Sequence, residues 1–218
     1  MRTRKNPGLR QEAFLRAATA LFLEKGFDGV SIREILDAVA DNSSSPSVFY
    51  YYFPSKEELY RACNERVTRE YLSAIESAFN ADVADEKERV LLLASHIEKY
   101  VMRGKRLISP GSSTGNRLYV LDLREQVVRR IAELWEKLLA EKYRMPEKDI
   151  AFTAKYLAGG VGELIMFFLL EETSCPQSTF EAYGEAAVRL TMNAIGLPPD
   201  RVSEMTEAFR TRKLRDPV

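Results

Sequence analysis

The run Tyr50–Tyr52 places three tyrosines side by side in a short predicted helix, Pro46–Tyr52, that follows a polar turn. Successive helical residues are about 100° apart, so the three rings cannot all be buried and at least one hydroxyl must face outward. We expect Phe49 and Phe53, four residues apart, to form the buried face. The exposed hydroxyl and apolar groups can then hydrogen-bond to phosphates and contact thymine methyl groups, which is the chemistry of DNA recognition.

Lys56 stands in the first turn of the next predicted helix, 55–81, which opens with a capping box of Ser55 and Glu58. The helix macrodipole disfavours a cation at this end by a few tenths of a kcal/mol. A docked phosphate would meet both the free backbone amides and the ammonium. A solvated side chain is the alternative, but beside a helix-turn-helix we favour the phosphate contact.

A second capping box marks the helix that must position the tyrosine helix. Ser31 and Glu34 form it at the start of a predicted helix over 31–40, and the polar turn 41–45 follows. The two short helices predict a helix-turn-helix, whose second helix is available to the major groove of DNA.

The first ten residues form a basic arm that contains no acidic residue. Its basic side chains are Arg2, Arg4, Lys5 and Arg10. The arm is either a solubilising tail or an element that enters a minor groove and neutralises phosphates. The whole chain has 32 basic and 32 acidic residues and therefore no net charge, which argues against a strongly electrostatic binder of nucleic acid.

Helical periodicity continues through nearly the whole chain, and we expect an all-α fold. The first predicted helix covers 8–25. After the long helix 55–81, the further predicted helices cover 84–103, 118–143, 147–172, 177–195 and 201–214, and 104–116 is the long irregular connection.

The composition is that of a soluble globular protein, with 45% hydrophobic and 29% charged residues. The longest apolar run, Leu164–Leu170, is far shorter than the roughly 18 residues of a membrane span. Cys63 and Cys175 lack C-x-x-C spacing, His96 is the lone histidine, and no phosphate loop or nucleophile elbow is visible. We expect a cytoplasmic protein that is not an enzyme and uses no membrane, cofactor or metal.

A specific pattern runs through the N-terminal quarter of the chain. It comprises Phe14, Ala18, Phe22, Gly26, Phe27, Val30, Ser31, Ile32, Arg33 and Ile35, followed by Phe-Tyr-x-Tyr-Phe-x-x-Lys-x-x-Leu at 49–59. Over about residues 10–60 this pattern resembles the DNA-binding domain of the TetR family of bacterial transcriptional regulators.

The resemblance implies an all-helical homodimer with two domains. A three-helix domain over 1–60 would bind double-stranded DNA, and a larger helical domain over 61–218 would bind a small-molecule effector and form the dimer. The expected DNA-binding residues are Arg4, Ser31, Arg33, Ser45, Ser47, Val48, Tyr50, Tyr51 and Lys56. The expected function is a repressor that binds a palindromic operator and is released by its effector.

The turn before the tyrosine helix departs from the family pattern. The segment 40–45 is about three residues longer than usual and lacks the glycine. A second interpretation therefore stays open, in which the chain is a helical interaction or adaptor protein whose helix-turn-helix no longer binds DNA.

Three glycines in five positions, 158–162, interrupt the apolar helix 147–172. Each costs about 1 kcal/mol relative to alanine, so a close helix or a ligand must explain them. We expect a dimer through the helices 147–172 and 177–195, although packing within one subunit is the alternative. The expected interface residues are Gly160, Gly184, Ala187, Thr191 and Ala194.

An effector pocket needs apolar walls and a few polar groups. The expected pocket residues are Tyr100, Met102, Tyr119, Leu123, Trp135, Phe152, Tyr156, Glu163 and Phe167. Each aromatic residue could equally be ordinary core. Glu163 could be a buried carboxylate that meets the ligand or an outward-facing one.

Overall fold

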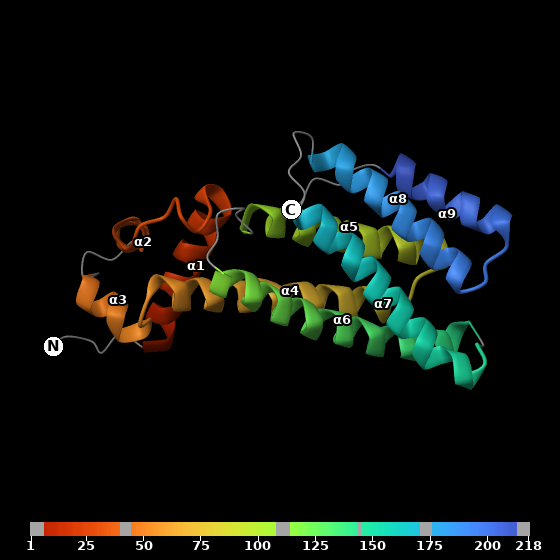
Figure 1. Ribbon diagram of the computed structural model, residues 1–218, viewed down its shortest axis with the longest axis horizontal. Helices are drawn as coiled ribbons and strands as arrows, with labels where there is room; N and C mark the ends of the chain where they lie inside the picture. The colour runs from red at the N-terminus through yellow and green to blue at the C-terminus, as the bar shows by residue number, and fades with distance from the viewer. Residues whose placement is uncertain (1–6, 40–44, 108–113, 144, 171–175, 213–218) are drawn as a thin grey trace. The chain divides into compact units, whose positions relative to one another are not determined.

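The computed structural model describes residues 7–39, 45–107, 114–143, 145–170 and 176–212 of the chain (Figure 1). These residues form nine α-helices and no strand, which confirms the predicted all-α fold. The helices are α1 (Pro7–Lys25), α2 (Ile32–Ala38), α3 (Pro46–Tyr52), α4 (Lys56–Phe79), α5 (Glu86–Leu107), α6 (Thr114–Lys142), α7 (Glu147–Leu170), α8 (Pro176–Ala194) and α9 (Pro199–Thr211).

Two predicted boundaries differ from the structure. The helix α2 ends at Ala38 because Val39 adopts an extended conformation (φ −76°, ψ 97°). Both ends of the expected irregular connection 104–116 are helical, since α5 runs on to Leu107 and α6 begins at Thr114.

The chain divides into two compact units. The first comprises Met1–Thr68 with Arg103–Tyr119, and the second comprises Arg69–Met102 with Val120–Val218. The helices α4, α5 and α6 therefore each contribute residues to both units. The expected domain boundary at residue 60 stays a prediction.

The first unit is built around an aromatic core. Phe14 and Phe22 of α1 and Phe49 of α3 are fully buried. The ring of Phe14 meets the ring of Phe49 edge-on at a centroid distance of 5.9 Å, and the ring of Phe22 meets that of Tyr60 in the same way at 5.3 Å. Such edge-to-face pairs add about 0.5–1.5 kcal/mol to the stabilisation from burial.

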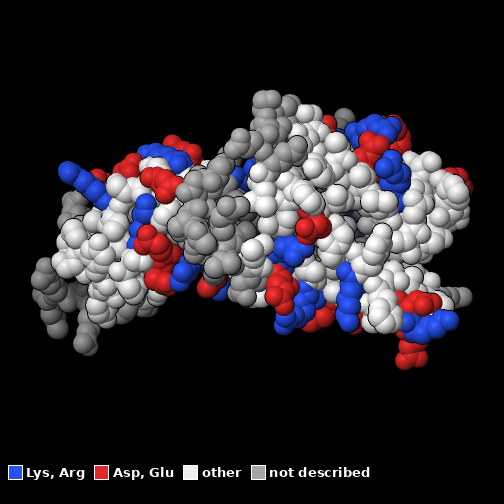
Figure 2. All heavy atoms as spheres, in the orientation of Figure 1, with Lys and Arg blue, Asp and Glu red and all other residues white. Residues whose placement is uncertain are grey.

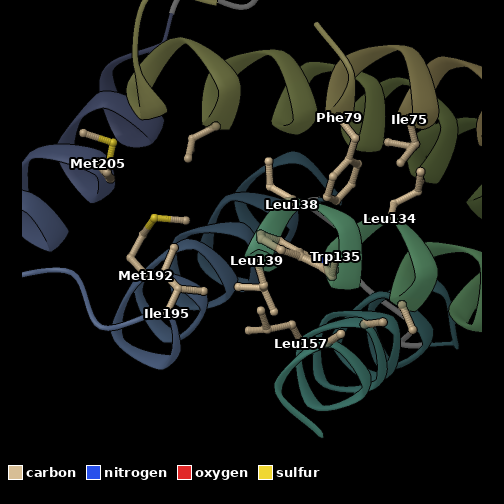
Figure 3. Packing of buried hydrophobic residues seen from close by; sticks show 14 of the residues in the cluster. Ile75, Phe79, Leu134, Trp135, Leu138, Leu139, Leu157, Met192, Ile195 and Met205 are labelled. Atoms are coloured by element: carbon tan, nitrogen blue, oxygen red, sulfur yellow. The ribbon is translucent and has the colours of Figure 1, made fainter. Parts of the chain in front are cut away.

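The core of the second unit joins six helices, α4 to α9. Figure 3 shows Ile75 and Phe79 of α4 pointing toward Leu134, Trp135 and Leu138 of α6. The same cluster includes Leu157 of α7, Met192 of α8 and Met205 of α9. The rings of Phe79 and Trp135 pack edge-on at 5.1 Å.

A second hydrophobic cluster contains Phe209 of α9, and a nearly buried ion pair packs against it. Its largest members are Phe168, Phe180 and Phe209. Arg212 donates to Glu98 at 2.8 Å, and both side chains are nearly buried, at 9% and 13% exposed. The guanidinium also lies 3.8 Å from the ring centroid of Phe209, so this pair fastens the end of α9 to α5.

Gly184 allows α8 to approach α9 closely, and this contact is testable. A methyl group added there would lie 2.3 Å from the buried ring of Phe209. We expect Gly184→Ala to lower the free energy of unfolding by about 1–3 kcal/mol in chemical denaturation, because the buried ring of Phe209 would have to shift.

Gly159→Ala is the matched control, since its added methyl group meets nothing within 4 Å. This variant should be neutral or up to about 1 kcal/mol more stable, because alanine favours a helix. Equal stability of the two variants would contradict the close packing of α8 on α9.

Candidate DNA-binding interface

The entry of α2 is fixed by the predicted capping box. The amide of Glu34 donates to the hydroxyl of Ser31 at 3.2 Å, and the amide of Ser31 donates back to the Glu34 carboxylate at 2.8 Å. The ammonium of Lys25, at the end of α1, donates to the same carboxylate at 2.8 Å. The hydrogen bond from Lys25, followed by those from Ser31, lowers the pKa of Glu34 to about 2.

Ser31 is therefore a capping residue in this structure. Its hydroxyl accepts from the amide of Glu34 and donates to the Glu34 carboxylate at 2.9 Å. Since its one hydrogen is engaged there, the expected DNA contact of Ser31 gains no support and stays a prediction. Arg33, two residues further on, is exposed and charged.

Lys56 binds backbone carbonyl groups, a contact that neither sequence interpretation predicted. Its ammonium donates to the carbonyl oxygens of Phe27, at 3.0 Å, and Val30, at 2.9 Å. It also lies 4.1 Å from the centroid of the Phe27 ring, within the range of a cation–π contact. Lys56 thus ties the start of α4 to the turn between α1 and α2, and a phosphate contact from its third N–H stays a prediction.

The rotation of α3 is set by Phe49, as the spacing predicted. Phe49 is fully buried and Phe53 is 4% exposed, with their ring centroids 6.1 Å apart. On the other side of the helix Tyr51 is 76% exposed and Tyr50 is 53% exposed. This confirms that tyrosine hydroxyls face outward from the helix.

The outward face of α3 also carries Ser47, which is exposed, and Val48, which is half-buried. The N-terminal residue Ser45 makes no side-chain cap, and its hydroxyl lies 3.4 Å from that of Ser47. The helix has no charged residue, and Figure 2 shows its region in white. The expected contact of Arg4 and the long turn 40–44 lie outside the described residues.

The residues of the expected effector pocket differ in exposure, and the pocket stays a prediction. Phe152, Tyr156 and Phe167 of α7 are 76%, 64% and 60% exposed, whereas Trp135 is buried in the core. Within this chain the three exposed aromatic residues gain no support as pocket walls, and their assignment stays a prediction. The helix α7 is apolar on nearly all sides, so its hydrophobic pattern does not identify the inward face.

The remaining pocket candidates have different surroundings. Glu163 is an exposed residue in an ion pair with Arg124 of α6, which corresponds to the outward-facing alternative. Tyr100 is half-buried beside Tyr71, with ring centroids 5.5 Å apart. Met102 and Leu123 are also half-buried, and the side chain of Tyr119 lies outside the described residues.

Part of the small-residue face of α8 packs within its own chain, which favours the alternative for Gly184 and Thr191, and the rest of the expected interface stays a prediction. Gly184 faces the ring of Phe209, and Thr191 is buried at 7% exposure. Ala187 and Ala194 are half-buried. Gly160 of α7 is different, because a methyl group added there would meet nothing within 4 Å.

The chemistry available elsewhere in the described residues is limited. They contain no group of three or more His, Cys, Asp or Glu side chains that could hold a metal ion. Burial raises the pKa of Cys63 to about 11, so its thiol is protonated at neutral pH. Among these residues α7 alone is long and apolar enough to cross a membrane, but one such helix is weak evidence for a span.

These features define a helix-turn-helix protein, in which an exposed reading helix precedes a larger helical unit. The family model "Bacterial regulatory proteins, tetR family" matches residues 14–63. The HTH-type transcriptional repressor NicS of Pseudomonas putida is 30% identical over 115 residues, which are 50% of this chain and 52% of NicS. This match spans about half the length of the curated relative.

Solved structures resemble almost the whole fold. The reduced form of E. coli NemR has a TM-score of 0.63 at 19% identity and covers 87% of this chain and 99% of its own. A TetR-family regulator from Pectobacterium atrosepticum has a TM-score of 0.63 at 18% identity and covers 90% and 100%. Residues 14–63 therefore match the TetR-family model, in line with the resemblance of their sequence pattern, and the chain has the fold of TetR-family regulators.

The contacts of Lys56 lead to a prediction about stability. Lys56→Met keeps the aliphatic stem but removes the donor to two carbonyl groups. We expect the free energy of unfolding to fall by about 1.5–3 kcal/mol in urea titrations, because the hydrogen bonds of a charged donor are lost.

Lys25→Met is the control, since it removes an ammonium that pairs with the exposed carboxylate of Glu34. Its cost should stay below about 1 kcal/mol. If Lys56→Met is no more costly than Lys25→Met, the ammonium of Lys56 does not hold the α1–α2 turn in solution.

Proposed function

We propose that this protein is a transcriptional repressor that binds operator DNA through the outward face of α3. The observation that carries the proposal is the division of this helix into two faces. Phe49 is fully buried, while Ser47, Tyr50 and Tyr51 are exposed together on the other side. A short helix with a buried anchor and an open polar face suits a major groove.

The relatives support the same function. NicS is a transcriptional repressor, and the family model that matches residues 14–63 is one of bacterial regulatory proteins. Neither match extends over the whole chain, so the activity of the intact protein is proposed here from its helix-turn-helix and its fold. The cytoplasm is the compartment in which such a protein would meet DNA.

We propose further that the protein is a homodimer and that α7 forms the contact. Large apolar side chains on one face of α7 are exposed, and a face of this kind marks an interaction site. They are Phe152, Tyr156, Phe167 and Leu170, with the open Gly160 between them. Figure 2 shows this stretch mostly in white.

A second copy of the chain suits this face of α7. Glu163, on the same side, is already paired with Arg124 of its own chain, so covering it does not bury an uncompensated charge. A two-fold dimer presents each exposed side chain twice and offers two α3 helices to the two halves of a palindromic operator.

A small-molecule effector bound in the second unit is the proposed signal. Tyr100 and Met102 are half-buried against the two hydrophobic clusters of this unit and remain the best candidates for contact. Tyr100 meets Tyr71 of α4, the helix that begins at Lys56. A ligand that favours one position of Tyr71 would act on that helix, within the limit of its differential affinity.

Loss of the Tyr51 side chain tests the DNA face. Tyr51→Ala should raise the dissociation constant for operator DNA about tenfold or more, because a contact worth about 1–3 kcal/mol is lost. The measurement is fluorescence anisotropy with duplexes selected from a random pool.

Leu121→Ala is the control, because it shortens an apolar side chain of α6 that is also half exposed. It should leave DNA affinity unchanged. If Tyr51→Ala binds as tightly as Leu121→Ala, the proposed DNA face is wrong, and binding to no duplex at all would favour the adaptor interpretation.

A charge on the exposed face of α7 tests the dimer. We expect Tyr156→Arg to convert the protein to folded monomers in analytical ultracentrifugation, because two like charges would be buried at the two-fold contact. Leu9→Arg, at an exposed apolar position of α1 in the first unit, should remain dimeric. A dimeric Tyr156→Arg variant would exclude α7 as the interface.

A further inference from the structure

We infer that α3 recognises thymine through its methyl group, so that the operator half-sites carry thymine where α3 meets the bases. The inference rests on the proposed DNA-binding function and names the sequence chemistry that this function requires. It follows from the types of side chain that α3 exposes and from the ring contacts that restrict the movement of Tyr50 and Tyr51.

The outward face of α3 lacks the side chains that read other bases. Guanine is read by the paired donors of Arg or by Lys, and adenine by the amide of Asn or Gln. The seven residues of α3 include none of these four types. A serine or tyrosine hydroxyl can bond to several bases, so apolar contact is the remaining source of selectivity, and thymine alone offers a methyl group in the major groove.

The positions of these side chains fit such a contact. Ser47 and Tyr51 are one helical turn apart and mark the centre of the outward face. Val48 and Tyr50 flank them. Val48 stands near the N-terminus of the helix, the part of a reading helix that contacts base edges.

The two exposed rings are held before DNA arrives. The ring of Tyr50 packs edge-on against buried Phe49 at 5.3 Å, and the ring of Tyr51 packs edge-on against Tyr52 at 4.9 Å. Rings supported in this way lose little conformational entropy on binding. The ring of Tyr51 and the methyl groups of Val48 are therefore the thymine contacts that we assign.

Three cations of the first unit are partly neutralised by carboxylates. Lys25, Arg61 and Arg66 are each paired with a carboxylate of the same unit, those of Glu34, Glu58 and Glu12. Such pairing reduces the attraction that these cations exert on phosphates. Contacts in the groove must then supply a larger part of the specific affinity.

Replacement of thymine by deoxyuridine tests the inference from the DNA side. The full-length protein first selects duplexes from a random pool, and each thymine of the selected half-site is then replaced by deoxyuridine. This removes only the methyl group and keeps the hydrogen-bonding edge. We expect the dissociation constant to rise about fourfold at one or two positions per half-site. Thymines outside the half-sites are the control and should tolerate the change.

Two variants connect this loss to α3. With Val48→Ala or Tyr51→Ala, deoxyuridine at the matching position should cost less than twofold, because the contact is already gone. Tyr51→Phe keeps the ring and should retain the fourfold loss. Thermal melting checks that each variant is folded.

The outcomes separate the inference from the function on which it rests. If duplexes are selected but deoxyuridine is neutral at every position, or if Val48→Ala and Tyr51→Ala both keep the full loss, thymine recognition by α3 is overturned and DNA binding stands. If no duplex is selected, the proposed function fails and the inference fails with it.

Discussion

The burial of Phe49 is the constraint on which the DNA-binding face depends. Its ring occupies the centre of an aromatic core with Phe14 and Phe53. A seven-residue helix has few backbone hydrogen bonds of its own, so packing must fix its rotation. Once Phe49 points inward, the helical geometry turns Ser47 and Tyr51 outward. The hydrophobic core and the reading surface are thus two consequences of one contact.

Hydrogen bonds of two charged side chains connect the other helices of the helix-turn-helix unit. The carboxylate of Glu34 joins the end of α1 to the start of α2, and the ammonium of Lys56 joins the turn between them to α4. In the second unit some large apolar side chains are exposed and do not pack in the core. The exposed aromatic face of α7 leaves a surface that a second chain would cover.

The sequence predicted the structural features that depend on residues close together in the chain. The capping box at Ser31 and the inward turn of Phe49 depend on residues three or four apart, and the structure confirms both. The partners of Lys56 are backbone carbonyl groups more than 25 residues earlier in the chain, and a carbonyl leaves no signal in the residue type. The inward face of α7 was not predictable because both of its faces are apolar. The sequence left Gly184 open between a dimer contact and packing within one subunit, because the ring of Phe209 that it accommodates lies on another helix.

Whether the outward face of α3 lies against the bases is measured most directly by photo-crosslinking. The selected duplex would carry 5-iododeoxyuridine in place of thymine, with iodine where the methyl group stood, and mass spectrometry would locate the linked residue. The predicted result is a crosslink within residues 46–52, at Tyr51 or a neighbour on its face. A duplex that stays bound but crosslinks only to residues outside α3 would contradict this placement of the helix.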